Sequence, residues 1–440
     1  GKTRLLYERA IEETMKHPDI QYLFVVPEQY TMQTQREIIR LHPQHGVMNI
    51  DILSFKRLAY RVFEDLGVQV PVVLDDTGKS MILRKAAGRR RKDLSFYGGH
   101  LDQAGFIDQL KSQISELYQY GLGPDDLKQV REETPDRRLL GEKLKDLEII
   151  YREFKEYIQT KCITAEEILD ILCRELPRWE KLKDSVIFLD GFTGLTPVQY
   201  RLAQIMIRCA REVVCTLTVD LREELYRECG IQHLFYMSRH TACRLKRLAD
   251  EEGVRLREDV RCGRRPGWRF AQSPELDFLE RNLYRYGREV WEDKTEAVQL
   301  CEGRNPGEEI GFVCASIWRM VQEEGMRFRD AALITGDLSS YKGEIARQFS
   351  ENGIPYFLDD KKSILENPMV ELIRAALDTI RDFSYENVCR YLKIGLVYDW
   401  EESGDFSRSY VEEMTDRLEN YLRALGIRGL KQWEESWERL

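Results

Sequence analysis

The stretch SVIFLDGFTGLTPVQY, residues 185–200, decides the fold. Its unbroken apolar run ends at Asp190 and predicts a strand that is buried on both faces, as strands of parallel sheets are. Pro197 then opens an amphipathic segment up to residue 210, because proline is favoured at the first position of a helix. The run VVCTLTVD at residues 213–220 predicts the next strand. This order of strand, helix and strand indicates an α/β fold with a parallel sheet.

Similar alternation continues on both sides of this stretch. Upstream, YLFVV at residues 22–26 and NIDIL at residues 49–53 predict two further strands, and the second leads into a helix. Downstream lies a second α/β set, with strands predicted from residues 298, 331 and 355 and helices predicted at residues 307–324 and 338–351.

From about residue 75 to residue 179, between the strands predicted at 49–53 and 185–190, apolar residues recur at helical spacing and predict a helical insertion. The predicted domains are a first sheet domain at 1–70 and 181–290, a helical insertion at 71–180, a second sheet domain at 291–381 and a partial second helical insertion at 382–440.

Composition narrows the class of protein. The 440 residues suffice for several domains, and no apolar run approaches the roughly 20 residues of a membrane helix. With no charged-then-apolar leader and ten cysteines without C-x-x-C spacing, we expect a soluble cytoplasmic protein with free thiols and no membrane contact. The net charge of −9 requires any nucleic-acid contact to lie in a local patch.

The first three residues, Gly1, Lys2 and Thr3, match the end of a phosphate-binding loop G-x-x-x-x-G-K-(S/T). In such a loop, backbone amides at a helix start hold phosphate, the lysine reaches the β and γ phosphates, and the hydroxyl binds Mg²⁺. A match of three residues leaves chance open as an alternative. The pattern predicts that these residues bind ATP and that Thr3 also binds Mg²⁺.

Two longer segments resemble motifs of superfamily 1 DNA helicases. DILSFKRLAYRVF at residues 51–63 is similar to the element T-F-H-S-F-x-x-R-(I/L), and residues 186–200 lie without a gap over D-E-x-Q-D-x-x-x-x-Q. Asp190 matches the aspartate that orders Mg²⁺ and is therefore predicted to share the ATP site. A capping role for a carboxylate at the end of a strand is the alternative. The resemblance implies two RecA-like parallel-sheet domains of the P-loop helicase type.

The departures from these motifs concern hydrolysis. Gly191 stands where a motor has the glutamate that activates water, and Gly194 stands where it has a second aspartate. Thr335 and Gly336 occupy the positions of an aromatic-arginine pair in the second domain, and residues 215–224 lack the pattern G-D-x-x-Q-x-I-Y. A general base contributes about 10²- to 10⁴-fold to a rate, so the sequence predicts a module that holds ATP but does not act as a motor.

The chain is similar over nearly its whole length to AddB, the second component of the bacterial AddAB (RexAB) ATP-dependent helicase/deoxyribonuclease. The similar segments are VPEQ-T, LSF-RLAYRV, LDGFTGLTPVQY, residues 353–377, RYLKIGL and LENYLRALGIRG. The resemblance implies an AddA-type motor and nuclease partner, single- and double-stranded DNA as ligands, and the processing of double-strand breaks for homologous recombination. The iron-sulfur cluster of the family is expected only in a C-terminal nuclease domain, outside these 440 residues.

The resemblance also implies that this part reads the Chi sequence in single-stranded DNA. By motif position, the DNA-binding residues are Gln29, Thr31, Phe55, Arg57, Tyr60 and Phe192. Aromatic rings stack on unpaired bases, and Gln and Arg bind base edges. Tyr60 departs from the tryptophan expected there, and periodicity alone favours a core role for Phe55 and Tyr60.

Two rival interpretations remain. The chain could be a working superfamily 1 translocase with a displaced catalytic carboxylate, such as Asp220 or Glu28. It could also be a structural scaffold that binds no ATP. The basic runs at residues 89–92 and 262–269 are interpreted as solvated charge rather than as DNA contacts.

Overall fold

The computed structural model describes residues 1–46, 49–103, 105–133, 137–158, 162–263, 270–285, 287, 289–360, 364–397 and 408–437. The chain forms two compact units, Gly1–Val298 and Gln299–Leu440. The basic run at residues 262–269 lies outside the described residues except for its first two members.

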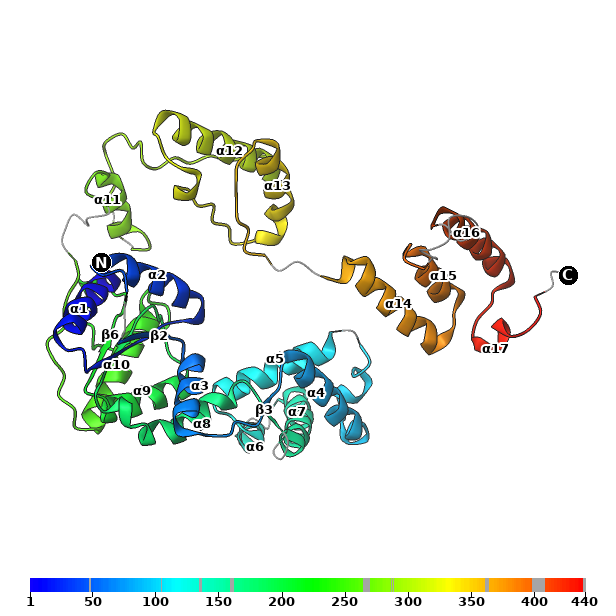
Figure 1. Cartoon of the computed structure of the whole chain (residues 1–440), viewed down its shortest axis with the longest axis horizontal. Coiled ribbons are helices and arrows are strands. Elements are labelled where there is room, and N and C mark those ends of the chain that lie inside the picture. The colour runs from blue at the N-terminus through cyan, green and yellow to red at the C-terminus, as the bar shows by residue number, and fades with distance from the viewer. Residues whose placement is uncertain are drawn as a thin grey trace. The chain divides into compact units, whose positions relative to one another are not determined.

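A parallel sheet forms the centre of the first unit (Figure 1). Its described strands are β1 (Gln21–Val25), β2 (Ile50–Leu53), β5 (Ser185–Leu189) and β6 (Glu212–Cys215), in the order β2-β1-β5-β6. The α/β class with a parallel sheet is thus confirmed, and the first three predicted strands are correct to within one residue. The fourth is shorter than predicted, because it leaves the sheet after Cys215.

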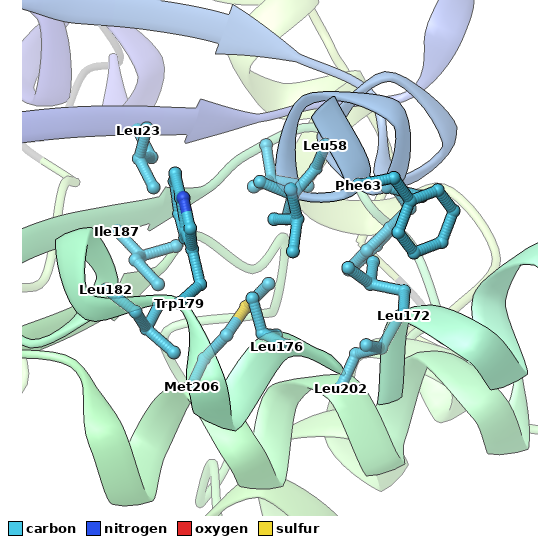
Figure 2. Packing of buried hydrophobic residues seen from close by; sticks show 14 of the residues in the cluster. Leu23, Leu58, Phe63, Leu172, Leu176, Trp179, Leu182, Ile187, Leu202 and Met206 are labelled. Carbon is cyan, nitrogen blue, oxygen red and sulfur yellow. The ribbon is translucent and has the colours of Figure 1, made fainter. Parts of the chain in front are cut away.

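Alternate residues of each strand face opposite helical layers, as the two-residue period of a strand requires. Tyr22, Phe24 and Phe188 pack with helices α1 and α2 on one face. Leu23 and Ile187 pack on the other face with α3, α8 and α9. The Trp179 ring lies beside these two residues (Figure 2). Burial on both faces explains why these strands are uniformly apolar.

The helices of the first unit cover the sheet or form a separate helical region. They are α1 (Lys2–Lys16), α2 (Thr31–Leu41), α3 (Phe55–Leu66), α4 (Asp76–Arg89), α5 (Phe106–Gln119), α6 (Pro124–Glu133), α7 (Arg138–Ile158), α8 (Glu167–Glu175), α9 (Pro197–Cys209), α10 (Tyr236–Glu251) and α11 (Pro274–Asn282).

Helices α4 to α7 have a core of their own around Leu83, Ile114, Tyr151 and Phe154. A short parallel pair, β3 (Val72–Val73) and β4 (Cys162–Ile163), connects this helical region to the sheet part. Helix α8 belongs to the sheet part instead, because its buried side chains pack against α3 and α9.

The second unit is helical in its described residues. Its helices are α12 (Pro306–Glu323), α13 (Leu338–Glu351), α14 (Pro368–Asp382), α15 (Tyr385–Lys393), α16 (Arg408–Leu425) and α17 (Leu430–Trp433). The two helices predicted at 307–324 and 338–351 are therefore confirmed as α12 and α13.

The strands predicted from residues 298, 331 and 355 form no ladder in the described part of this unit, so a second sheet is not confirmed. Leu300, Ile334 and Phe357, which such a sheet would bury, are almost fully exposed. No helix among the described residues has the length and apolar character needed to cross a membrane.

Candidate functional site

The carboxyl ends of all four strands meet at one edge of the sheet, because the strands are parallel. The segments that leave this edge are residues 26–30 after β1, Ser54 after β2, Asp190 after β5 and residues 216–222 after β6. A cavity of about 1540 Å³ lies here and is lined by Lys2, Thr3, Asp190, Gly191, Thr216 and Asp220, among others. Ligands of open α/β sheets bind at such an edge.

The structure brings three of the predicted ATP-site side chains together at the start of α1. The Thr3 hydroxyl donates to Asp190 Oδ1 at 3.3 Å, although the two residues are far apart in sequence. Asp190 is only 4% exposed and also accepts a hydrogen bond from the Thr216 hydroxyl. Lys2 Nζ donates to Thr218 Oγ1 at 2.5 Å, and Gly1 caps the helix.

Thr216 and Thr218 are site residues that the sequence motifs do not include. Both follow β6 at the shared edge, one on each side of Leu217, so the alternation T-L-T after an apolar strand is the signal that could have found them. Burial and the nearby negative charge of Asp190 raise the pKa of the Cys215 thiol to about 12. The site is therefore a place where hydroxyls, one ammonium and one carboxylate converge while the neighbouring thiol stays protonated.

A magnesium ion bound with nucleotide fits this arrangement. Mg²⁺ takes oxygen ligands from one or two protein groups and completes its octahedron with phosphate and water. The buried Asp190 carboxylate and the Thr3 hydroxyl supply such groups. In the part of the chain that is described, no group of three or more His, Cys, Asp or Glu residues could hold a metal, so no metal site made by such side chains alone is found there.

Gly191, which directly follows Asp190, has a backbone conformation that favours glycine. Its φ is +80°, which lies in the left-handed region that favours glycine. A Cβ at this position would lie 3.4 Å from Pro27 Cδ and 3.5 Å from Tyr30 Cδ2, which are ordinary contacts. The constraint on this position therefore comes from the backbone and not from crowding.

The two carboxylates considered as displaced catalytic bases are either held in ion pairs or lie outside the cavity. Asp220 is 7% exposed and forms ion pairs with Arg222, at 3.2 Å, and with Arg285. Glu28 is exposed on the short 3₁₀ turn Glu28–Tyr30 and does not line the cavity. Neither is a free carboxylate beside Asp190.

The predicted strand-contact residues lie at the ends of β1, β2 and β5, but they differ in exposure. Gln29 and Arg57 are exposed, and Tyr60 is 41% exposed. Phe55 is only 5% exposed in the core beneath the sheet, and its ring lies 5.5 Å from that of the half-buried Phe192.

Thr31 is also buried, and its hydroxyl donates to the Glu28 carbonyl at 3.0 Å. The Thr31 hydroxyl therefore contacts the turn Glu28–Tyr30, which contains Gln29.

Comparison with known proteins identifies the family. Residues 1–280 match the family model described as ADDB, N-terminal. The chain belongs to the AddB family.

Curated relatives of this AddB-family chain are named as the B-type subunit of an ATP-dependent helicase/deoxyribonuclease. The relative from Lachnoclostridium phytofermentans is 38% identical, and the match covers 100% of this chain and 38% of the relative. Those from Heliobacterium modesticaldum and Geobacillus kaustophilus are each 34% identical over 99% of this chain, with 35% and 38% of their own lengths covered. The chain thus spans little more than a third of the length of these relatives.

In the second unit, Thr335 and Gly336 precede α13 and supply no cation. The Thr335 hydroxyl accepts a hydrogen bond from the Asp337 amide at 3.2 Å, and Asp337 in turn caps the helix. In this AddB-family chain the pair therefore lies at a helix start, where Thr335 helps to orient the capping Asp337.

Proposed function

We propose that this AddB-family chain is the helicase-shaped part of an ATP-dependent helicase/deoxyribonuclease subunit that holds nucleotide without hydrolysing it and reads single-stranded DNA. The observation that carries the proposal is the assembled set of Lys2, Thr3 and Asp190 beside a glycine of positive φ. The names of the curated relatives support the assignment to such an enzyme complex.

Nucleotide binding would use the amino-terminal end of α1. In this proposal Lys2 leaves Thr218 and pairs with the β and γ phosphates, because a charge-assisted bond to phosphate is stronger than one to a neutral hydroxyl. Thr3 and Asp190 would hold Mg²⁺, which would neutralise phosphate charge. Thr216 would keep the Asp190 carboxylate oriented toward the ion.

Hydrolysis would fail because the site has neither a general base for the attacking water nor a cation for the transferred phosphoryl group. Gly191 cannot accept a proton, and Asp220 is held in ion pairs with two arginines. Without an arginine at Thr335 or Gly336, the transferred phosphoryl group would also lack a charge-assisted partner in the transition state. These features favour a nucleotide-holding module over the rival of an active translocase.

Strand recognition would fall on the exposed residues of the sheet edge. Gln29 and Arg57 offer planar donor groups for base edges, and Tyr60 offers a ring for stacking. Phe55, Phe192 and Thr31 would support this surface from beneath. We further propose that the recognised sequence is Chi, that an AddA-type partner drives the DNA, and that the complex processes double-strand breaks for homologous recombination.

The full fold in this proposal has two RecA-like domains with helical insertions, at the boundaries given by the sequence analysis. The first corresponds to the sheet part of the first unit. The second would form its sheet from the exposed segments around Leu300, Ile334 and Phe357. An iron-sulfur cluster would lie in a C-terminal nuclease domain, outside these 440 residues.

The deciding experiment uses the complete protein in complex with its partner. One equivalent of a fluorescent ATP analogue, bound in addition to that on the partner, is expected to be lost in the Lys2→Ala and Asp190→Asn variants but retained in Gly88→Ala, a helix position far from the site in sequence. If the unaltered complex binds no analogue beyond that on the partner, the chain is a scaffold. If its isolated form shows DNA-stimulated ATPase that Lys2→Ala abolishes, it is a motor.

A further inference from the structure

Helix α10 carries a row of aromatic and basic side chains that no motif of the sequence analysis includes. Tyr236, His240 and Arg244 follow one another at intervals of four residues, so they lie on one face of the helix. The rings of Tyr236 and His240 lie 5.7 Å apart, and Tyr200 of α9 lies 6.4 Å from His240. His240 and Arg244 are exposed, and the two tyrosines are half-buried. We call these four residues the α10 row.

The opposite face of α10 is already occupied. Ala242, Leu245 and Ala249 line the cavity at the sheet edge, and the helix packs against α9. The α10 row is therefore not needed to attach the helix to the sheet, and its exposed members need another explanation.

The row adjoins the loop that follows β5. The Tyr200 hydroxyl shares a hydrogen bond of 3.0 Å with Thr241, and a Cβ at Gly194 would lie 2.6 Å from Met237 Cε. Phe192, in the same loop, contacts Phe55 at the start of α3. The loop after β5 thus contacts α3 through Phe192 and α10 through Gly194.

The charge of α10 is opposite to that of the chain. Residues 236–249 contain Arg239, Arg244, Lys246 and Arg247 and no acidic residue, whereas the whole chain has a net charge of −9. Arg239, Lys246 and Arg247 form ion pairs. Arg244 forms no ion pair with any described residue.

We infer that the α10 row is a second, sequence-independent contact for single-stranded DNA. Aromatic rings beside a cation without an ion pair suit a single strand, because its bases present ring faces and its backbone presents phosphates. A protein interface would instead be expected to have a larger apolar share at its centre. The inference rests on the proposed function and extends the strand path from the Gln29, Arg57 and Tyr60 edge onto α10.

The test measures binding of oligo-dT, which contains no Chi sequence, to the complete protein with its partner over a series of salt concentrations. Tyr236→Ala with His240→Ala is expected to weaken binding by about fivefold or more, since a stacked base contributes at least that factor. Arg244→Ala is expected to reduce the slope of log affinity against log salt by about 0.7, the value for one phosphate contact on a single strand. Arg244→Lys should restore the slope.

Arg247→Ala is the matched control, because Arg247 lies on the same helix but is paired with Glu228. The inference is overturned if the α10 variants bind oligo-dT as the unaltered complex does while Arg57→Ala still weakens binding to Chi-containing DNA. If neither set changes DNA binding, the proposed function fails as well. If the α10 variants instead dissociate the complex in sedimentation, the row is a protein interface and the inference is wrong.

Discussion

At the scale of single residues, the left-handed backbone conformation of Gly191 limits which side chains this position accepts. A φ of +80° costs an L side chain about 1–2 kcal/mol, whereas asparagine tolerates the left-handed region better. We expect Gly191→Ala and Gly191→Glu to lower the free energy of unfolding by about 1 kcal/mol and Gly191→Asn to lower it less. Gly191→Glu should gain no ATPase activity, because the strained backbone does not aim its carboxylate as in a motor.

Thermal unfolding of the variants and a phosphate-release assay check this expectation. Gly88→Ala is the control, because Gly88 lies inside α4 with nothing within 4 Å of an added Cβ, so alanine there should not destabilise. A Gly191→Glu protein of unchanged stability that hydrolyses ATP would contradict both parts.

The sequence motifs anticipated the spatial grouping of Lys2, Thr3 and Asp190 better than they anticipated the exposure of the predicted strand-contact residues. Lys2, Thr3 and Asp190 are found together because each directly follows or begins an element whose position the parallel sheet determines. Phe55 matches a motif by sequence, yet its helix turns it into the core, and only the packing of α3 against α8 decides that. Arg285 pairs with Asp220 from the segment that follows α11, whose path no local pattern specifies.

At the scale of elements, a buried ion pair joins three helices of the first unit. Lys79 of α4 donates at 2.9 Å to both carboxylate oxygens of Glu166, next to α8, and to Ser115 of α5. Lys79 is 3% exposed, and removing one partner of such a pair typically costs about 3–5 kcal/mol. We expect Lys79→Met to lower the free energy of unfolding at neutral pH by that order.

The same pair predicts a pH dependence. Burial acts to raise the pKa of Glu166, but the hydrogen bonds and charge of Lys79 outweigh it, and the folded pKa lies below 4.5. The stabilisation is therefore fully present above about pH 4.5 and is lost as the pH falls through the folded pKa. Unfolding measured between pH 3 and 7 should show the gap between the unaltered protein and Lys79→Met shrinking in acid. A gap that does not change with pH would exclude the ion pair as its cause.

The positions of strands could be predicted from the sequence where burial alone determines them. The apolar runs of β1 and β5 are buried on both faces, so their positions follow from hydrophobicity, whereas the edge strand β2 is only partly buried. The strand predicted to end at Asp220 stops at Cys215. The Thr216 amide still donates to the Leu189 carbonyl of β5 at 2.9 Å, and its hydroxyl donates to Asp190. The three apolar segments of the second unit have no strand neighbours among the described residues, and a strand pattern does not say what it pairs with.

At the scale of the whole molecule, the proposed function assigns nucleotide holding and DNA reading to separate sets of residues on one edge of one sheet. Lys2, Thr3 and Asp190 lie around the start of α1, whereas Gln29, Arg57 and Tyr60 follow β1 and β2. In the assembled complex we expect Lys2→Ala to leave DNA-stimulated ATP turnover unchanged in a phosphate-release assay, since the partner supplies it in the proposed mechanism. Because the two sets of residues differ, Lys2→Ala should also leave the preference for Chi-containing over scrambled strands unchanged.

Arg57→Ala, by contrast, should lower the preference for Chi-containing strands and leave ATP turnover unchanged. A bidentate contact to a base contributes about 1–3 kcal/mol of discrimination, so the preference for Chi should fall by about fivefold to 150-fold. Titration calorimetry of both strands against the complex measures it, and Arg61→Ala is the control, because Arg61 on the same helix lies within 3.9 Å of Asp65. Equal loss of affinity for both strands would make Arg57 a phosphate contact, because phosphates are the same in every sequence.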